Sequence, residues 1–169
     1  MGNLEADESD GSFLKLPINY SIVTNIDYEH LDFYKNYKNL ENSFIEFINK
    51  VPTFGKSFIC IDDKNNNDLL KKLKIKNYFT YGTNPKSQFY IKNIKQLKDF
   101  SEYDLSIKLP GKKNLNIKNI KIPLLGIHNI RNSTAAAAVS LTIGISPKLI
   151  KNGLREFEGV QRRFNKIFS

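Results

Sequence analysis

The sequence predicts an α/β fold: a three-layer parallel sheet with crossover helices, extended by a small antiparallel sheet. Over residues 21–82, apolar strand-like runs alternate with helical patterns, an order typical of parallel strands joined by crossover helices. Over residues 86–123 no helical period is present, and short stretches alternate apolar with polar side chains instead. The 169 residues, of which 40% are hydrophobic, suffice for one domain with a substantial core.

Three β-branched or apolar runs predict the buried strands of the parallel sheet, at residues 21–26, 56–62 and 77–82. Residues 39–51 form a helical pattern whose apolar side chains fall on one face, with Asn39 as the expected N-cap. A shorter amphipathic helix is expected over residues 68–75, after an Asn-rich loop. Cys60 lies in the second strand and should be buried, and as the single cysteine it forms no intrachain disulfide.

Three alternating stretches predict an antiparallel hairpin or small sheet within residues 86–123, namely QFYIKNI, YDLSIKLPG and LNIKNIKIP. In the third stretch the apolar phase slips at Lys118 and Asn119, which predicts a β-bulge there.

Two helices are expected after this region. Residues 132–145 are alanine-rich, and Gly144 is a suitable C-terminal stop. Residues 146–157 begin with Ser146 as N-cap, followed by a proline at the first helical position. The final segment, GVQRRFNKIF, predicts the beginning of a further strand.

The composition narrows the class of protein. The net charge of +9 comes from 26 Lys and Arg against 17 Asp and Glu, but the lysines are spread along the chain and only four residues are Arg. A nucleic-acid surface normally needs a clustered basic stripe, so a solvated basic surface is favoured. No apolar run approaches the ~20 residues of a membrane span, and the N-terminus lacks a secretory signal. Together with the single cysteine, these features favour the cytoplasm.

Two acidic motifs are candidates for cation binding. In EADESDGSF, Glu5 and Asp7 share one face if residues 3–8 end a strand, and carboxylates at such an end suit a hard cation such as magnesium. In VTNIDYEHLD, His30 stands among three carboxylates just after the first strand, where it suits a metal ion or a proton-carrying role. The alternatives are an exposed acidic terminus and a surface histidine stabilised by its acidic neighbours.

Two further motifs are candidates for nucleotide binding. In GIHNIRNSTAAAA, His128, Asn129 and Asn132 gather at a helix start, where amides pair with base edges and backbone N–H groups suit anions. In GVQRRF, adjacent arginines point to opposite faces of a strand, so one of them faces a site and can stabilise a transferred phosphoryl group. The alternatives are an asparagine cap on an alanine-rich helix and a surface salt bridge.

In this order, the four motifs resemble the central domain of the Mur ligases, over nearly the whole chain and least in the region of residues 86–123. EADESD together with VTNI-x-x-x-H-x-D is similar to the branch of that family that joins L-alanine to UDP-N-acetylmuramate. The resemblance implies that residues 1–169 are the latter part of a central ATP-binding domain. It also implies that an N-terminal UDP-binding domain and a C-terminal domain are absent from this chain.

The resemblance implies an ATP-dependent, amide-forming ligase of peptidoglycan biosynthesis, and thus a role in cell-wall formation, cell shape and cell division. In this family ATP phosphorylates a carboxylate, here the lactyl group of UDP-N-acetylmuramate. The amine of L-alanine then attacks the acyl phosphate, while magnesium neutralises the phosphates.

By motif position, the resemblance also implies residue roles. Glu5 and His30 match residues that bind magnesium, with His30 beside the acyl phosphate and therefore in a catalytic position. Arg163 matches the arginine that approaches the phosphates of ATP, a role that is both nucleotide-binding and catalytic. The residues that match the surroundings of the adenine are His128, Asn129 and Asn132.

One departure from the family pattern and three alternatives remain. No G-x-x-x-x-G-K-[ST] or G-K-T sequence is present, so we expect this chain alone to lack ligase activity and to bind ATP weakly at best.

One alternative is another ligase of the superfamily, such as a folylpolyglutamate synthase or a later Mur ligase. The second is a basic nucleic-acid-binding module with salt-dependent affinity. The third is a non-catalytic remnant of a gene.

Overall fold

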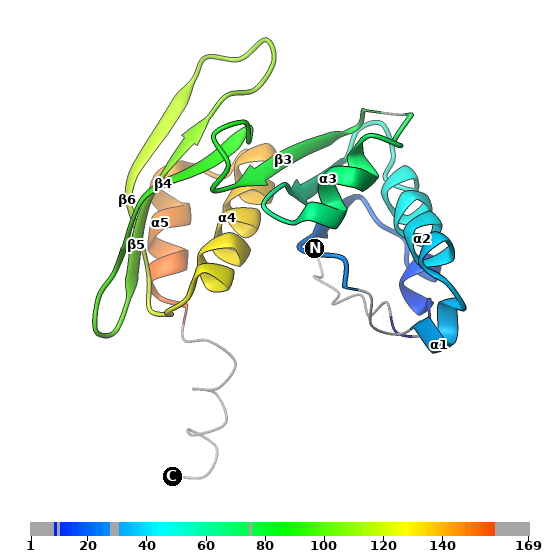
Figure 1. Ribbon diagram of the computed structural model, residues 1–169. Helices are drawn as coiled ribbons and strands as arrows, with labels where there is room; N and C mark the ends of the chain where they lie inside the picture. The colour runs from blue at the N-terminus through cyan, green and yellow to red at the C-terminus, as the bar shows by residue number, and fades with distance from the viewer. Residues whose placement is uncertain (1–8, 10, 28–30, 75, 158–169) are drawn as a thin grey trace. The chain divides into compact units, whose positions relative to one another are not determined.

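The computed structural model describes residues 9, 11–27, 31–74 and 76–157, and these form a mixed six-stranded sheet with helices, which confirms the predicted α/β class. The strands are hydrogen-bonded in chain order: β1 Tyr20–Val23, β2 Lys56–Cys60, β3 Tyr78–Gly82, β4 Phe89–Gln96, β5 Ser101–Ile107 and β6 Leu115–Ile122. The helices are η1 Ser12–Lys15 (3-10), α1 Leu31–Tyr34, α2 Tyr37–Asn49, α3 Lys64–Leu70, α4 Ile127–Thr142 and α5 Pro147–Arg155 (Figure 1).

Contacts divide the chain into two units, which are described separately below. The first contains the residues up to 59 together with residues 63–79, and the second contains residues 60–62 together with those from 80 onward. In the first unit, β1 and β2 are parallel, from Tyr20 opposite Lys56 to Val23 opposite Ile59. This pairing agrees with the predicted parallel sheet, because α2 supplies the crossover that parallel strands require.

The apolar face predicted for residues 39–51 is confirmed: Leu40, Phe44, Phe47 and Ile48 are buried in α2, and Val51 is buried just after the helix ends. The predicted N-cap is wrong. Asn36 caps α2, and its Oδ1 accepts a hydrogen bond from the N–H of Asn39 at 3.0 Å. Most of the apolar face packs in one cluster with side chains from η1, β1, β2 and α3.

The helix predicted over residues 68–75 begins four residues earlier, at Lys64. Asp63 caps it by accepting a hydrogen bond from the N–H of Asn66 at 2.8 Å. The fully buried Asn66 also donates through Nδ2 to the carbonyl oxygen of Thr24, just beyond β1, at 3.2 Å. These contacts draw the Asn-rich segment into the helix despite the low helix propensity of asparagine.

In the second unit the sheet changes direction. β3 and β4 are parallel over two residue pairs, Tyr81–Phe89 and Gly82–Tyr90, whereas β4, β5 and β6 pair antiparallel, as predicted for residues 86–123. Helices α4 and α5 lie on the same face of β4–β6 (Figure 1). Along β6 buried and exposed side chains interchange, which is typical of an antiparallel sheet with one solvated face.

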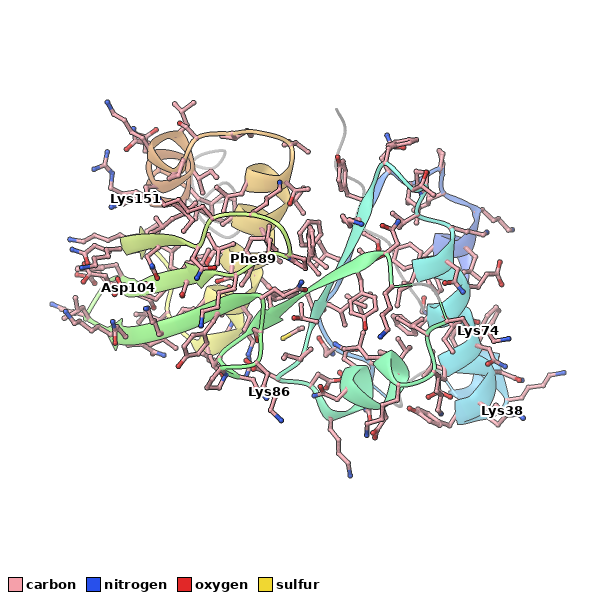
Figure 2. The ribbon with its side chains drawn as sticks, turned by 90° about the horizontal axis from the view of Figure 1, so that it is seen from above. Lys38, Lys74, Lys86, Phe89, Asp104 and Lys151 are labelled. Carbon is pink, nitrogen blue, oxygen red and sulfur yellow. The ribbon has the colours of Figure 1, made fainter. Side chains whose placement is uncertain are left out.

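The bulge predicted at Lys118 and Asn119 is confirmed, because both residues lie opposite Asp104 on β5 and Asn119 has a φ of 55°. A second bulge, which the sequence did not predict, lies at Asn93 and Ile94 of β4. Asp104, which Figure 2 labels, holds both bulges. Its Oδ2 accepts a hydrogen bond from Nδ2 of Asn93, and its Oδ1 accepts one from the N–H of Asn119, each at 2.8 Å. One carboxylate therefore stabilises the irregular part of all three antiparallel strands.

Helix α4 begins at Ile127, five residues before the predicted start, and ends just before Gly144, whose φ of 93° provides the predicted stop. Helix α5 has the predicted cap, since the Ser146 side chain accepts from the N–H of Leu149. The strand predicted within GVQRRFNKIF and the strand end predicted at residues 3–8 lie outside the described residues. Within the described part of the chain, no helix has the length and apolar character needed to cross a membrane.

Candidate functional site

The start of α4 brings three of the predicted site residues together. Gly126 is the N-cap residue with a φ of 96°, and a Cβ there would lie 2.8 Å from Cε1 of His128. Glycine is therefore required for this close turn. His128, Asn129 and Asn132 occupy the first two turns, and at about 100° per residue they fall within one side of the helix.

The polar side chains of these two turns differ in exposure and in the hydrogen bonds that they make within the protein. His128 and Asn132 are exposed, whereas Asn129 is half-buried and donates through Nδ2 to the carbonyl oxygen of Leu125 at 2.7 Å. Among the described residues no side chain caps the first backbone N–H groups, because the N-cap residue is Gly126. The interpretation that an asparagine caps this helix is therefore wrong. The imidazole, the amide of Asn132 and the backbone N–H groups have the chemistry to bind a base or an anion.

The other predicted site residues, Glu5, His30 and Arg163, lie outside the described residues, so the expected magnesium site and the phosphate-contacting arginine stay predictions. Among the residues that the structure does describe, no group of three or more His, Cys, Asp or Glu side chains could hold a metal ion.

A second polar cluster lies at the end of β2, centred on Asp62. Its carboxylate accepts hydrogen bonds from the backbone N–H of Thr83 at 2.9 Å, from Oγ1 of Thr83 at 2.9 Å and from the N–H of Asn84 at 3.0 Å. Nε of Arg131, on α4, donates to Oδ2 at 2.7 Å. The Asp62 side chain is only 5% exposed, so these donors replace water around a buried charge.

The environment keeps this carboxylate charged. Burial by itself would raise the pKa of Asp62, but the N–H and hydroxyl of Thr83 and the Arg131 guanidinium hold it below its ordinary value of 3.8. A Cβ on Gly82 would lie 2.5 Å from Oδ1, so glycine is needed for the chain to pass this close to Asp62.

Sequence reasoning missed this cluster, although a signal for it was present. Polar residues lie close after the ends of two neighbouring strands: Asp62 is two residues beyond β2, and Thr83 with Asn84 directly follows β3. The carboxyl ends of parallel strands meet at one edge of a sheet, so these residues could have been grouped. No local pattern pointed to Arg131, which is 69 residues away from Asp62 in the chain.

Comparison with known proteins gives a consistent family. The model described as "Mur ligase middle domain" matches residues 1–140. The chain is 74% identical over 166 residues to a UDP-N-acetylmuramate–L-alanine ligase of Pelagibacter ubique, which covers 98% of this chain and 36% of that protein. It is 39% identical over 168 residues to the ligase of the same name from Bartonella tribocorum. The chain thus spans about a third of the length of the curated relatives that it matches.

Solved structures share the fold. A UDP-N-acetylmuramate-alanine ligase, MurC, from Thermotoga maritima superposes with a TM-score of 0.70 at 24% identity, over 94% of this chain and 34% of that one. MurF from Acinetobacter baumannii superposes with a TM-score of 0.71 at 19% identity, over 90% of this chain and 32% of that one. At these identities the likeness establishes the fold alone.

Proposed function

Because the chain belongs to the Mur ligase middle-domain family, we propose that it is the ATP-binding part of a ligase that joins L-alanine to UDP-N-acetylmuramate in peptidoglycan synthesis. The observation that carries this proposal is the 74% identity, over 98% of the chain, with a protein of that name. We place the activity in the cytoplasm and assign the UDP moiety and the amino acid to further domains before and after this one.

In the proposed reaction, ATP phosphorylates the lactyl carboxylate of UDP-N-acetylmuramate, and the amine of L-alanine displaces phosphate from the acyl phosphate to form the amide. Magnesium, when bound, neutralises phosphate charge. The contribution of this chain is binding and orientation: the first turns of α4 offer an imidazole, amides and backbone N–H groups to the nucleotide. We assign His128, Asn129 and Asn132 to the adenine side of the site.

Three roles rest on family resemblance. We propose that Glu5 and His30 bind magnesium and that Arg163 approaches the phosphates of ATP. Charged groups in these positions would stabilise the negative charge that spreads over the transferred phosphoryl group.

The first prediction concerns activity in a complete enzyme. A hybrid ligase is built from the Pelagibacter ubique protein by replacing the segment 74% identical to this chain with the chain itself. We expect this hybrid ligase to release ADP only when both UDP-N-acetylmuramate and L-alanine are present, and the isolated chain to release none. The coupled ADP assay measures both, with the parental ligase as the positive control.

Two results would contradict the proposal. The first is a hybrid ligase that is folded by circular dichroism and yet binds no ATP and releases no ADP. The second is ADP release by the isolated chain in the presence of both substrates, which would overturn the expectation that this chain is insufficient on its own.

The second prediction concerns the adenine side of the site. In the hybrid ligase, Asn132→Ala should raise the KM for ATP about tenfold, because an amide bonded to a base is lost, with ~1–1.5 kcal/mol of binding energy. Asn152→Ala, which removes a half-buried asparagine from α5, is the matched control and should leave this KM unchanged. Equal KM values for the two variants would remove Asn132 from the site.

A further inference from the structure

Four donor groups from two separate segments converge on the carboxylate of Asp62. The backbone N–H groups of Thr83 and Asn84 and the hydroxyl of Thr83 come from the short connection between β3 and β4. Nε of Arg131 comes from the second turn of α4. Asp62 therefore ties the end of β2, the β3–β4 connection and α4 together at a single point.

The position of Arg131 on the helix is what matters for the site. It lies three residues after His128 and directly before Asn132, so at about 100° per residue it is about 60° from the direction of His128 around the helix axis. Movement of Arg131 relative to the sheet would therefore displace both of those side chains.

Among the described residues, the first turn of α4 makes no polar side-chain contact with the sheet. In the second turn, the hydroxyl of Ser133 lies 2.8 Å from that of Tyr103 on β5, one residue beyond Asn132. Gly126 provides no side-chain cap, and within the described part of the chain the Asn129 side chain bonds only to the preceding Leu125, which moves with the helix. Ile130 is fully buried and anchors the helix by packing, but apolar packing is non-directional and does not by itself define rotation about the axis. A charge-assisted hydrogen bond of 2.7 Å is directional.

From this arrangement we infer that Asp62 and Arg131 are positioning residues that set the rotation of the start of α4 and so orient His128 and Asn132 toward the nucleotide. This inference rests on the proposed function. The ordinary alternative is a salt bridge that only stabilises the fold. The two differ in outcome, since a stabilising pair changes the melting temperature, whereas a positioning pair also changes the affinity for one substrate selectively.

The test uses four variants of the hybrid ligase, of which Asp104→Asn is a control for stability alone. Arg131→Leu removes the charged donor, and Arg131→Lys keeps a positive charge and one possible hydrogen bond to Asp62. Arg155→Leu is the matched control, because Arg155 is exposed and pairs only with its neighbour Glu156 among the interactions of the described residues. KM values for ATP, L-alanine and UDP-N-acetylmuramate, equilibrium binding of Mg-ATP and the melting temperature are measured for each.

We expect Arg131→Leu to raise the KM and the Kd for ATP about tenfold, with the other two KM values changed by less than about twofold, because only the nucleotide-facing groups are displaced. Arg131→Lys should recover most of the ATP affinity, and Arg155→Leu should match the unsubstituted hybrid. Asp104→Asn, which loosens a distant part of the same unit, should lower the melting temperature without changing the KM for ATP.

The outcomes separate the two proposals. If the unsubstituted hybrid ligase binds no ATP, the proposed function fails and the inference falls with it. If the hybrid binds ATP and Arg131→Leu binds it equally well, or if all three KM values rise together, the positioning role is wrong while the proposed function stands.

Discussion

Replacing Asp62 by alanine is expected to lower the free energy of unfolding of the chain by about 3 kcal/mol, the lower end of the range for removing one partner of a buried ion pair, because the Arg131 side chain stays partly exposed. The loss is large because the substitution leaves three kinds of donor without an acceptor: two backbone N–H groups, the Thr83 hydroxyl and the Arg131 guanidinium. The 5% exposure of the side chain leaves little room for water to replace it. Urea unfolding followed by circular dichroism measures the change.

Two controls sharpen this prediction. Asp62→Asn keeps the shape and one acceptor oxygen, so its loss should be smaller than that of the alanine variant. Asp99→Ala removes an exposed carboxylate, and its effect should stay within about 0.5 kcal/mol. A loss below about 1 kcal/mol for Asp62→Ala would show that the cluster contributes little to stability.

The lowered pKa of Asp62 predicts how the free energy of unfolding changes at acid pH. The pKa of Asp62 is lower in the folded chain than its ordinary value of 3.8, so its ionised form stabilises the fold. This contribution is complete at pH values above the ordinary pKa and is lost as the pH falls through the lowered one. Stability of the Asp62→Asn variant should therefore fall less steeply than that of the unsubstituted chain as the pH is lowered below about 4.

Asp104→Ala is the substitution with the second largest expected effect, a loss of about 2–3 kcal/mol in the free energy of unfolding. It removes two hydrogen bonds to an ionised acceptor, each of which contributes about 1.5 kcal/mol at most when part of the site is solvated. Both bulges lose their shared partner, and Asn93 and Asn119 keep positive φ angles of 53° and 55° without it. Thermal and urea unfolding of the chain measure the loss.

Protonation of Asp104 at low pH should destabilise the fold, as protonation of Asp62 does, because the pKa of Asp104 is also lowered. Burial tends to raise its pKa, but the N–H of Asn119 and the amide of Asn93 lower it by more, with Lys118 and Lys92 adding to the effect.

The bulge at Lys118 and Asn119 is also bonded to α5. Nζ of Lys151, a residue that Figure 2 labels, donates a hydrogen bond to the carbonyl oxygen of Lys118 at 2.8 Å. Lys151→Met should therefore cost less than Asp104→Ala, and the reverse order would contradict a central role for Asp104.

Much of the fold follows from short-range patterns in the sequence. The spacing of the apolar residues Leu40, Phe44, Phe47 and Ile48 specified the buried face of α2. Ser146 with the following proline specified the start of α5. The slip of apolar phase at Lys118 and Asn119 located a bulge. Each of these features depends on residues within about two turns or a few strand positions, where periodicity and capping act directly.

The misplaced elements have a common cause in contacts between distant segments. The sequence predicted a loop where α3 begins, because asparagine is a weak helix former, and the hydrogen bond from Asn66 to Thr24 reversed that preference. The predicted start of α4 was late for a related reason. Ile127 and Ile130 precede the alanine-rich run, and burial of Ile130 against the rest of its unit extends the helix to Gly126.

The sequence alone determined the family of the chain and the place of His128, Asn129 and Asn132 at a helix start, because motifs and helical spacing are local properties. Only the tertiary structure decided what holds that helix start in place. Asp62 and Arg131 are 69 residues apart, and neither has a distinctive local pattern. They meet because the sheet brings the end of β2 beside the β3–β4 connection and α4. A buried carboxylate loses its bound water, so it is stable only when nearby hydrogen-bond donors replace that water.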